Sequence, residues 1–242
     1  PKEHFHGSDL EKIEAVYGIK KEDITSFSAN VNPLGVSPLL RSTLASHIDA
    51  ITSYPDREYT SLRECIAAYT GTDASQVIVG NGSTELIPLF IQIEHPKKAM
   101  ILGPTYSEYE REISLGGGTT LYYPLREKDD FVLDVDDFTA HLNESIDLLV
   151  LCNPNNPTGT VVEKEYLATL ISHNPQVCFV IDQSYEFFTL RRLFSAAEAA
   201  EFPNVLLLHS MTKRYAVPGL RLGYVTGAPH LQHRLRTNRM PW

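Results

Sequence analysis

The segment at positions 210–224 reads Ser210-Met211-Thr212-Lys213-Arg214-Tyr215-Ala216-Val217-Pro218-Gly219-Leu220-Arg221-Leu222-Gly223-Tyr224. Short apolar runs at 205–208 and 222–226 flank it, and each run is typical of a buried strand. The connection is too short for a helical crossover, so these two strands cannot be parallel neighbours. The segment places Lys213 at the end of a core strand, where a lysine is rarely buried without a partner.

Other short apolar runs precede this segment, at 77–79, 99–102, 119–123, 148–152 and 177–181. Several of them are separated by stretches with helical spacing of apolar residues. An alternation of strands and helices is typical of an α/β domain. The sequence therefore predicts a mixed, mostly parallel seven-stranded sheet with flanking helices.

The composition excludes several classes of protein. The chain has 242 residues, and 21 Lys and Arg against 30 Asp and Glu give a net charge of −9 without a basic block. Neither nucleic acid nor a membrane is expected as a partner, and no run is long and apolar enough to span a bilayer. The start of the chain also lacks the layout of a signal peptide. The three cysteines, Cys65, Cys152 and Cys178, lack metal-ligand spacing and indicate buried thiols in a reducing compartment. We therefore expect a cytoplasmic protein without a metal site.

Unusual polar residues follow the expected strands. They are Gly82, Ser83, Thr84, Thr105, Tyr106, Asn156, Asp182, Tyr185, Ser210, Thr212 and Lys213. Ligands of open α/β sheets collect at the carboxyl ends of the strands, so these residues are expected to share one site. Each has a plain alternative when it is taken alone: an ordinary turn for Gly82, a helix cap for Asp182, a core aromatic for Tyr106.

Lys213 has two chemical interpretations. Ser210-x-x-Lys213 matches the serine–lysine pattern of β-lactamases and penicillin-binding proteins, but the chain lacks their Ser-Asp-Asn and Lys-Thr-Gly elements. The other interpretation is a Schiff base between the lysine and a cofactor aldehyde. That chemistry needs an acid for a pyridine nitrogen, donors for a ring oxygen, an aromatic partner and a phosphate site, and the strand ends supply each of them.

The chain contains three motifs in series, Asn156-Pro157-Thr158-Gly159, Asp182-x-x-Tyr185 and Ser210-x-Thr212-Lys213 with Arg221. In this order and spacing they resemble the fold-type-I pyridoxal-phosphate enzymes of the aspartate aminotransferase superfamily. The resemblance runs from about Asn30 to the end of the chain. Within the superfamily, the segments 27–35 and 212–224 are most similar to threonine-phosphate decarboxylases of cobalamin biosynthesis. Histidinol-phosphate aminotransferases are the next most similar. The start His6-Gly7-Ser8 resembles the His-Gly-Gly of the decarboxylases, from which Ser8 departs.

The resemblance implies a role for each site residue toward pyridoxal 5′-phosphate. Lys213 forms the Schiff base and later acts as general acid and base, and Asp182 pairs with the pyridine nitrogen. Asn156 and Tyr185 hold the ring hydroxyl, with Tyr185 counted among the catalytic residues, and Tyr106 stacks on the ring. The implied phosphate ligands are Gly82, Ser83, Thr84, Ser210, Thr212 and Arg221.

Further implications concern partners and substrate. Tyr54 resembles a tyrosine that reaches the cofactor phosphate of the neighbouring subunit, which implies a homodimer with shared active sites. His6, Asn32 and Gly35 are the candidates for contacts with a small phosphorylated, amino-acid-like substrate. The implied domains are an N-terminal arm with part of a small domain at 1–36, the cofactor-binding large domain at 37–228, and the start of a linker helix at 229–242. A C-terminal small domain is expected after Trp242 and is absent from this sequence.

The implied activity is decarboxylation of L-threonine O-3-phosphate to (R)-1-aminopropan-2-yl phosphate for cobalamin biosynthesis. The alternative is a class I/II aminotransferase, such as a histidinol-phosphate aminotransferase. A non-catalytic, aminotransferase-like binding domain is a third interpretation. The chain shows no basic DNA-binding extension, which that interpretation would require.

Overall fold

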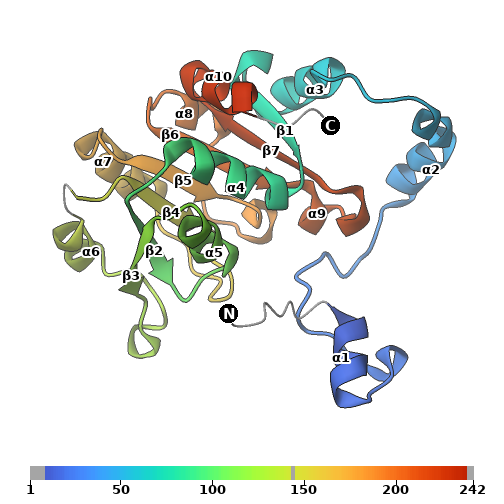
Figure 1. Ribbon diagram of the computed structural model, residues 1–242, viewed down its shortest axis with the longest axis horizontal. Helices are drawn as coiled ribbons and strands as arrows, with labels where there is room; N and C mark the ends of the chain where they lie inside the picture. Colours follow the sequence, from blue (N-terminus) through green and yellow to red (C-terminus); the bar gives the residue numbers. More distant parts are fainter. Residues whose placement is uncertain (1–8, 143–144, 239–242) are drawn as a thin grey trace.

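A single seven-stranded sheet forms the centre of the computed structural model, which describes residues 9–142 and 145–238 (Figure 1). The strand order is β1-β7-β6-β5-β4-β2-β3. The strands are β1 (Val77–Asn81), β2 (Lys98–Gly103), β3 (Thr119–Pro124), β4 (Leu148–Cys152), β5 (Cys178–Asp182), β6 (Val205–Ser210) and β7 (Leu222–Gly227).

The pairing of the strands confirms a mixed, mostly parallel sheet. Strand β7 is antiparallel to both of its neighbours, β1 and β6, whereas the pairs among β2 to β6 are parallel. The registers align Cys152 with Asp182 and Asp182 with Leu208. The carboxyl ends of β4, β5 and β6 therefore meet at one edge of the sheet.

Helices cover both faces of this sheet. They are α3 (Thr60–Thr70), α4 (Ser83–Glu94), α5 (Glu108–Leu115), α6 (Val135–His141), α7 (Lys164–His173), α8 (Ala196–Ala200), α9 (Met211–Arg214) and α10 (Pro229–Asn238). One core cluster joins α4, α5 and α10 to the sheet, and a second joins α6, α7 and α8 to it. Neighbouring residues alternate between the clusters: Val180 of β5 belongs to the first and Ile181 to the second. Strands buried on both faces read as continuous apolar runs, as these strands do.

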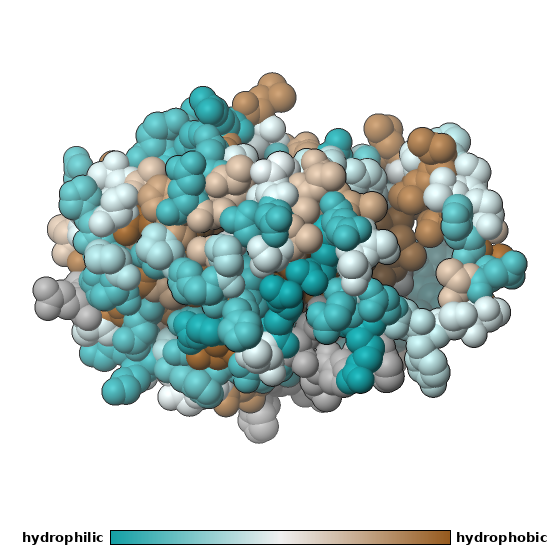
Figure 2. All heavy atoms as spheres, turned by 90° about the horizontal axis from the view of Figure 1, so that it is seen from above, coloured by the Kyte–Doolittle hydropathy of each residue, from teal (hydrophilic) through white to brown (hydrophobic). Residues whose placement is uncertain are grey.

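The N-terminal part of the chain forms an arm outside the layered domain (Figure 1). The arm contains α1 (Leu10–Tyr17), α2 (Pro38–Ser46) and the short 3₁₀ helix η2 (Ile48–Thr52), none of which has a buried residue. Side-chain caps start the two α-helices of the arm: the Asp9 carboxylate accepts from the amide of Lys12, and the Ser37 hydroxyl accepts from that of Leu40. Figure 2 shows apolar side chains gathered at the end of the molecule where the arm lies.

Helix α10 occupies the segment that the sequence predicts to lead out of the domain. Its Leu231 and Leu235, one turn apart, are buried against the cluster that includes α4. The guanidinium of Arg234 also lies 3.0 Å from a carboxylate oxygen of Glu94. Two leucines at this spacing make a narrow apolar stripe even in a mostly polar helix, and the stripe packs α10 onto the domain.

The cysteines are all free thiols. Cys152 and Cys178 are buried in β4 and β5 as predicted, whereas Cys65 is exposed on α3. Within the part of the chain that the structure describes, no helix is long and apolar enough to cross a membrane.

Candidate active site

A cleft of about 550 Å³ lies at the carboxyl ends of the central strands. Its volume falls in the range of about 300–1,000 Å³ that is usual for sites of small ligands. The turns after β4, β5 and β6, the start of α4 and the segment 28–31 line it. The predicted site residues among its lining are Ser83, Thr84, Tyr106, Asn156, Asp182, Tyr185, Ser210, Thr212, Lys213 and Arg221. Residues that lie up to 138 positions apart in the sequence therefore share one site, as the strand ends indicate.

Asp182 is held by several hydrogen bonds in this cleft and is only 4% exposed. The Tyr109 hydroxyl donates to its Oδ2 at 2.5 Å. The backbone N–H and the hydroxyl of Ser184 donate to Oδ1 at 2.9 and 2.5 Å. A buried carboxylate with this many donors keeps a fixed orientation, because each oxygen has a directed partner.

Lys213 lies close to Asp182 and Tyr185 in the same cleft. Burial lowers its pKa, the carboxylate of Asp182 opposes this shift, and the guanidinium of Arg221 adds to it. The amine therefore loses its proton at a lower pH than that of a free lysine, and a neutral amine is the form that can act as a nucleophile or base. Its Nζ lies 5.9 Å from the centre of the Tyr185 ring.

Two tyrosines give the cleft aromatic walls with polar ends. Burial, together with the charges of Glu108 and Asp182, raises the pKa of Tyr106 to about 12. Burial also raises the pKa of Tyr185, whereas a hydrogen bond from the Asn30 amide to its hydroxyl, 3.3 Å long, lowers it. Both hydroxyls are therefore protonated at neutral pH and can donate to a ligand.

Hydroxyls, helix amides and one guanidinium gather at one end of the cleft, a combination that suits an anion. Arg221 Nη2 donates to the Thr84 hydroxyl at 3.0 Å, beside the first turn of α4. The first N–H groups of a helix have no partner within the helix and attract anions. Gly82 precedes this turn with a φ of 76°, and a Cβ there would lie 2.5 Å from Arg221 Nη2. Gly82 thus contributes space and backbone geometry without lining the cleft itself.

Side-chain hydrogen bonds fix the turn that carries Asn156. The Asn155 amide donates to the carbonyl oxygen of Pro104 at 2.9 Å, and its own oxygen accepts from the Thr105 hydroxyl at 2.8 Å. Asn153 exchanges two hydrogen bonds with the backbone of Val162, both 2.9 Å long. Asn153 and Asn155, which precede Asn156, therefore hold the turn, and Asn156 itself faces the cleft.

The arm reaches the cleft through the segment that contains Asn30 and Asn32. The backbone N–H of Asn32 donates to the carbonyl of Lys213 at 2.9 Å, and its side-chain amide donates to that of Arg214 at 3.0 Å. The segment is thereby fixed to α9, although Asn32 does not line the cleft.

Of the predicted residues that the structure describes, five do not line the cleft, namely Asn32, Gly35, Tyr54, Gly82 and Thr105. Tyr54 is 85% exposed on the arm and does not line the cleft of its own chain. Gly35 follows Asn32 in a turn with a φ of 73° and does not line it either. His6 lies outside the described residues, and Asn32 contacts α9 as described above.

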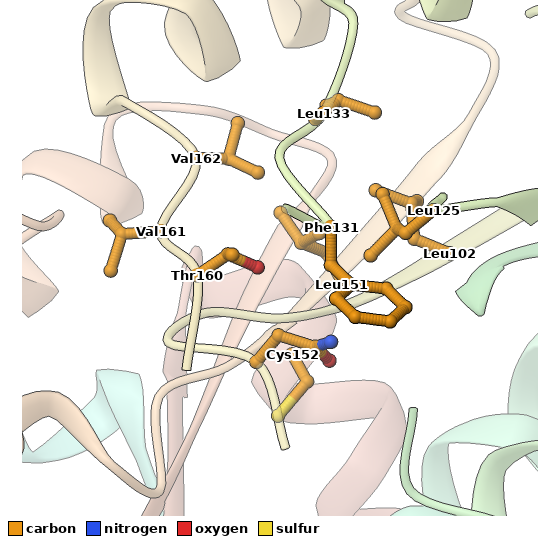
Figure 3. Close-up of a pocket in the computed structure, with 10 residues that line it drawn as sticks. Leu102, Leu125, Phe131, Leu133, Leu151, Cys152, Thr160, Val161 and Val162 are labelled. Atoms are coloured by element: carbon orange, nitrogen blue, oxygen red, sulfur yellow. The ribbon is translucent and has the colours of Figure 1, made fainter. Parts of the chain in front are cut away.

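A second cavity of about 10 Å³ lies behind the end of β4 (Figure 3). Leu102, Leu125, Phe131 and Leu151 form much of its wall. This volume is that of about one water molecule, so the cavity cannot hold a cofactor.

Sequence reasoning missed two residues that contact Asp182, namely Tyr109 and Ser184. Tyr109 is fully buried; burial and the carboxylate of Asp182 raise its pKa well above the usual value, so its hydroxyl stays a donor. A signal existed for Ser184, because an Asp followed two residues later by a donor is typical of a local Asx turn. Tyr109 follows Tyr106 by about one helical turn, and nothing in the sequence links it to Asp182.

The family model for class I and II aminotransferases matches residues 22–242. Over 240 residues, the chain is 33% identical to a threonine-phosphate decarboxylase from Salmonella typhimurium, covering 98% of this chain and 66% of that protein. It is also 29% identical to a histidinol-phosphate aminotransferase from Caldicellulosiruptor saccharolyticus, covering 99% of this chain and 67% of the other.

Among solved structures, the fold is similar to that of L-threonine-O-3-phosphate decarboxylase from Porphyromonas gingivalis, with a TM-score of 0.81 and 26% identity. That match covers 90% of this chain and 65% of the other. The chain thus spans about two thirds of the length of each of these relatives.

Gly82→Ala is expected to weaken the binding of pyridoxal 5′-phosphate to the full-length protein about tenfold, or about 1.4 kcal/mol. The new methyl group would displace the Arg221 guanidinium from its place beside α4. The dissociation constant can be measured by quenching of protein fluorescence.

Gly71→Ala is the matched control. Gly71 has a similar φ of 70°, so alanine is equally strained there, but a Cβ would meet nothing within 4 Å. Equal affinities of the two variants would show that Arg221 and Gly82 do not form the anion site.

Proposed function

Since this chain belongs to the family of class I and II aminotransferases, we propose that it is the cofactor-binding part of an enzyme that uses pyridoxal 5′-phosphate. The observation that carries the proposal is the presence of Lys213, Asp182 and Arg221 in one cleft. An amine with a lowered pKa, a fixed carboxylate and an anion site are the three groups that this cofactor requires of a protein.

The residues of the cleft fit the cofactor chemically. Its phosphate would bind at the first turn of α4, where Ser83, Thr84 and Arg221 supply donors and positive charge. Ser210 and Thr212 offer two more hydroxyls. Tyr106 would lie against the ring, and Asn156 and Tyr185 would donate to its hydroxyl group.

Asp182 and Lys213 would supply the acid–base chemistry. Tyr109 and Ser184 orient Asp182, whose negative charge would hold a proton at the ring nitrogen. Lys213 would hold the cofactor covalently, then accept or donate a proton at the substrate carbon once the substrate amine has replaced it. When bound, pyridoxal phosphate supplies an electron sink for the negative charge that develops on that carbon.

We propose decarboxylation of L-threonine O-3-phosphate to (R)-1-aminopropan-2-yl phosphate as the activity, in which a proton replaces the carboxylate lost as carbon dioxide. The 33% identity to the Salmonella decarboxylase supports it. The 29% identity to a histidinol-phosphate aminotransferase supports a second candidate, transamination of histidinol phosphate. Both relatives are named for phosphorylated compounds, which accords with a small phosphorylated substrate.

Two incubations of the full-length holoenzyme distinguish these activities. With L-threonine phosphate alone, we expect aminopropanol phosphate and carbon dioxide, detected by mass spectrometry. Formation of glutamate from histidinol phosphate and 2-oxoglutarate would instead identify the aminotransferase. Turnover in neither incubation would contradict both candidates.

Lys213→Ala provides the control for the chemistry in the same assays. The variant is expected to lose the visible absorbance of bound cofactor and all measurable turnover. Lys164→Ala serves for comparison, because Lys164 is a buried lysine paired with Glu198 at 2.5 Å, away from the cleft, and should keep both signals. A Lys213→Ala protein with normal absorbance and rate would remove the lysine from the mechanism.

We further propose a homodimer in which the arm of one copy packs on the other. Ile51 and Tyr54 on the arm are 80% and 85% exposed, and a second copy would cover such apolar side chains. Tyr54 does not line the cleft of its own chain, which accords with a contact to the cleft of a partner.

Light scattering during size-exclusion chromatography of the full-length protein is expected to give twice the monomer mass. Ile51→Glu should shift the protein towards monomer, because a charge would then be buried in the interface. Leu115→Glu, on an exposed leucine at the end of α5, should leave the mass unchanged. A monomeric wild-type protein would rule out the shared site.

We also propose a cytoplasmic location, which the three free cysteines support. Fractionation of source cells is expected to recover the protein with the cytoplasmic fraction, and recovery from the exterior would contradict this.

A further inference from the structure

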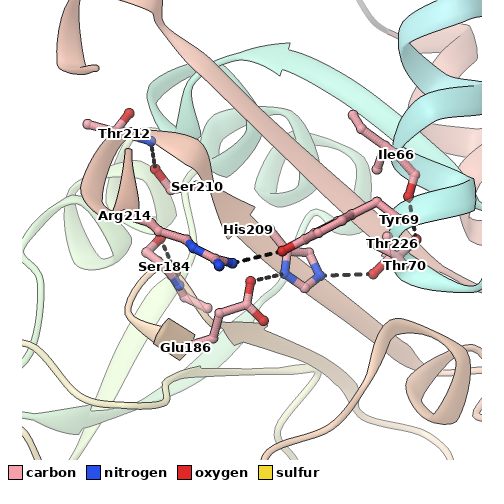
Figure 4. A network of polar contacts seen from close by, with 11 residues as sticks. Ile66, Tyr69, Thr70, Ser184, Glu186, His209, Ser210, Thr212, Arg214 and Thr226 are labelled. Carbon is pink, nitrogen blue, oxygen red and sulfur yellow. Dashed lines mark hydrogen bonds and ion pairs between the residues drawn. The ribbon is translucent and has the colours of Figure 1, made fainter. Parts of the chain in front are cut away.

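Two segments carry residues to the cleft and also meet behind it. One is the turn after β5, which contains Tyr185 and the 3₁₀ helix η5 (Glu186–Phe188). The other is the end of β6 with α9. Tyr185 and Ser210 line the cleft, whereas their chain neighbours Glu186 and His209 do not and instead contact each other (Figure 4).

His209 lies at the centre of this rear contact and is only 3% exposed. Its Nδ1 lies 3.2 Å from Glu186 Oε1, and its Nε2 lies 3.1 Å from the Thr226 hydroxyl. A carboxylate can only accept, so Nδ1 carries the hydrogen. The imidazole also stacks on the ring of Tyr224, with centroids 4.5 Å apart and planes inclined by 14°. With both ring nitrogens bonded and one face covered, the imidazole has a single orientation.

A second contact joins the same two segments. The Arg214 guanidinium lies 3.6 Å above the centre of the Phe187 ring, within the range of a cation–π interaction. Arg214 Nη1 also donates to the Tyr69 hydroxyl of α3 at 2.8 Å (Figure 4). Glu186 and Phe187 of the turn after β5 are thus connected to His209 at the end of β6 and to Arg214 of α9.

We propose that Glu186 and His209 are positioning residues. Their contact with each other, behind the cleft, sets the distance between Tyr185 and helix α9, which carries Lys213. Glu186 directly follows Tyr185. His209 directly precedes Ser210, whose hydroxyl accepts from the backbone N–H of Thr212 at the start of the helix that carries Lys213. Each partner is therefore one residue away from a group that faces the cleft, and a small shift of either changes the site.

This inference rests on the proposed cofactor chemistry, in which Tyr185 and Lys213 act on the same group. A displacement of about 1 Å at a reacting group can cost about a hundredfold in rate, so a contact that fixes two such groups has a catalytic consequence. Because His209 is buried and Glu186 is mostly so, their hydrogen bond is stronger than it would be in water.

The test uses four variants of the full-length holoenzyme: Glu186→Gln, Glu186→Asp, Glu186→Ala and His209→Ala. Glutamine keeps the reach of the side chain and still accepts from Nδ1, whereas aspartate keeps the charge but is one methylene too short. The variants Glu186→Asp, Glu186→Ala and His209→Ala are expected to raise the Kd for pyridoxal 5′-phosphate about tenfold. They should also shift the visible band of the bound cofactor or the pH at which that band titrates. Glu186→Gln should restore most of the wild-type Kd and spectrum.

Glu198→Ala is the matched control, because Glu198 pairs with Lys164 away from the cleft. It should lower the melting temperature and leave Kd and spectrum unchanged. If Glu186→Asp and His209→Ala also lowered only the melting temperature and left Kd and spectrum unchanged, the positioning role would be overturned. A Kd closer to that of the wild type in Glu186→Asp than in Glu186→Gln would overturn it as well.

The wild-type protein separates this inference from the proposed function. No visible band in the wild type would overturn the cofactor site, and this inference with it. A normal wild-type band together with unaltered variants would overturn the positioning role alone. The Gln and Asp variants are conservative replacements of a side chain that is 22% exposed, so their comparison stands even if an alanine variant does not fold.

Discussion

The burial of one carboxylate at the end of β5 constrains the rest of the site. Asp182 lines the cleft and is almost fully buried, so its charge would cost several kcal/mol if it were unpaired. Three hydrogen bonds offset this cost, one from the hydroxyl of Tyr109 and two from the backbone N–H and hydroxyl of Ser184. These donors come from the helix on one side of the strand and from the turn that continues it. The orientation of the carboxylate, and hence what it can hold, follows from the packing of α5 on the sheet.

Residues next to each other in the sequence have different roles in the site. At the end of β6, neighbouring side chains point to opposite faces, and in the turn after β5 one residue faces the cleft while the next contacts only protein, so a residue that supports the site stands next to one that forms it. Ser210 and His209 are one such pair, and Tyr185 and Glu186 are another. The cleft therefore has an inner layer that can contact a ligand and an outer layer that contacts only protein.

Much of the inner layer could be predicted from the sequence, whereas the outer layer and two lining residues, Tyr109 and Ser184, could not. Asn156, Asp182 and Lys213 each follow a short apolar run, and in a parallel sheet the ends of such runs meet at one edge. The sheet type followed from the short connection between β6 and β7. Tyr109 and Asp182 are 73 residues apart, and their contact depends on how far α5 rotates about its axis, which no local pattern records. The packing of α10 was missed for a similar reason, because two leucines among polar residues became a core stripe only once α4 offered a surface.

The hydrogen bonds between the arm and α9 also bear on how the molecule assembles. Asn32 and Arg214 are separated by 182 positions, and Asn30 and Tyr185 by 155. Contacts across such long stretches of chain close large loops, which slows their formation relative to local ones. During synthesis the arm leaves the ribosome long before the lysine helix exists to bind it. The sheet and its helices can form first, and the wall of the cleft that the arm provides is then among the last parts to settle.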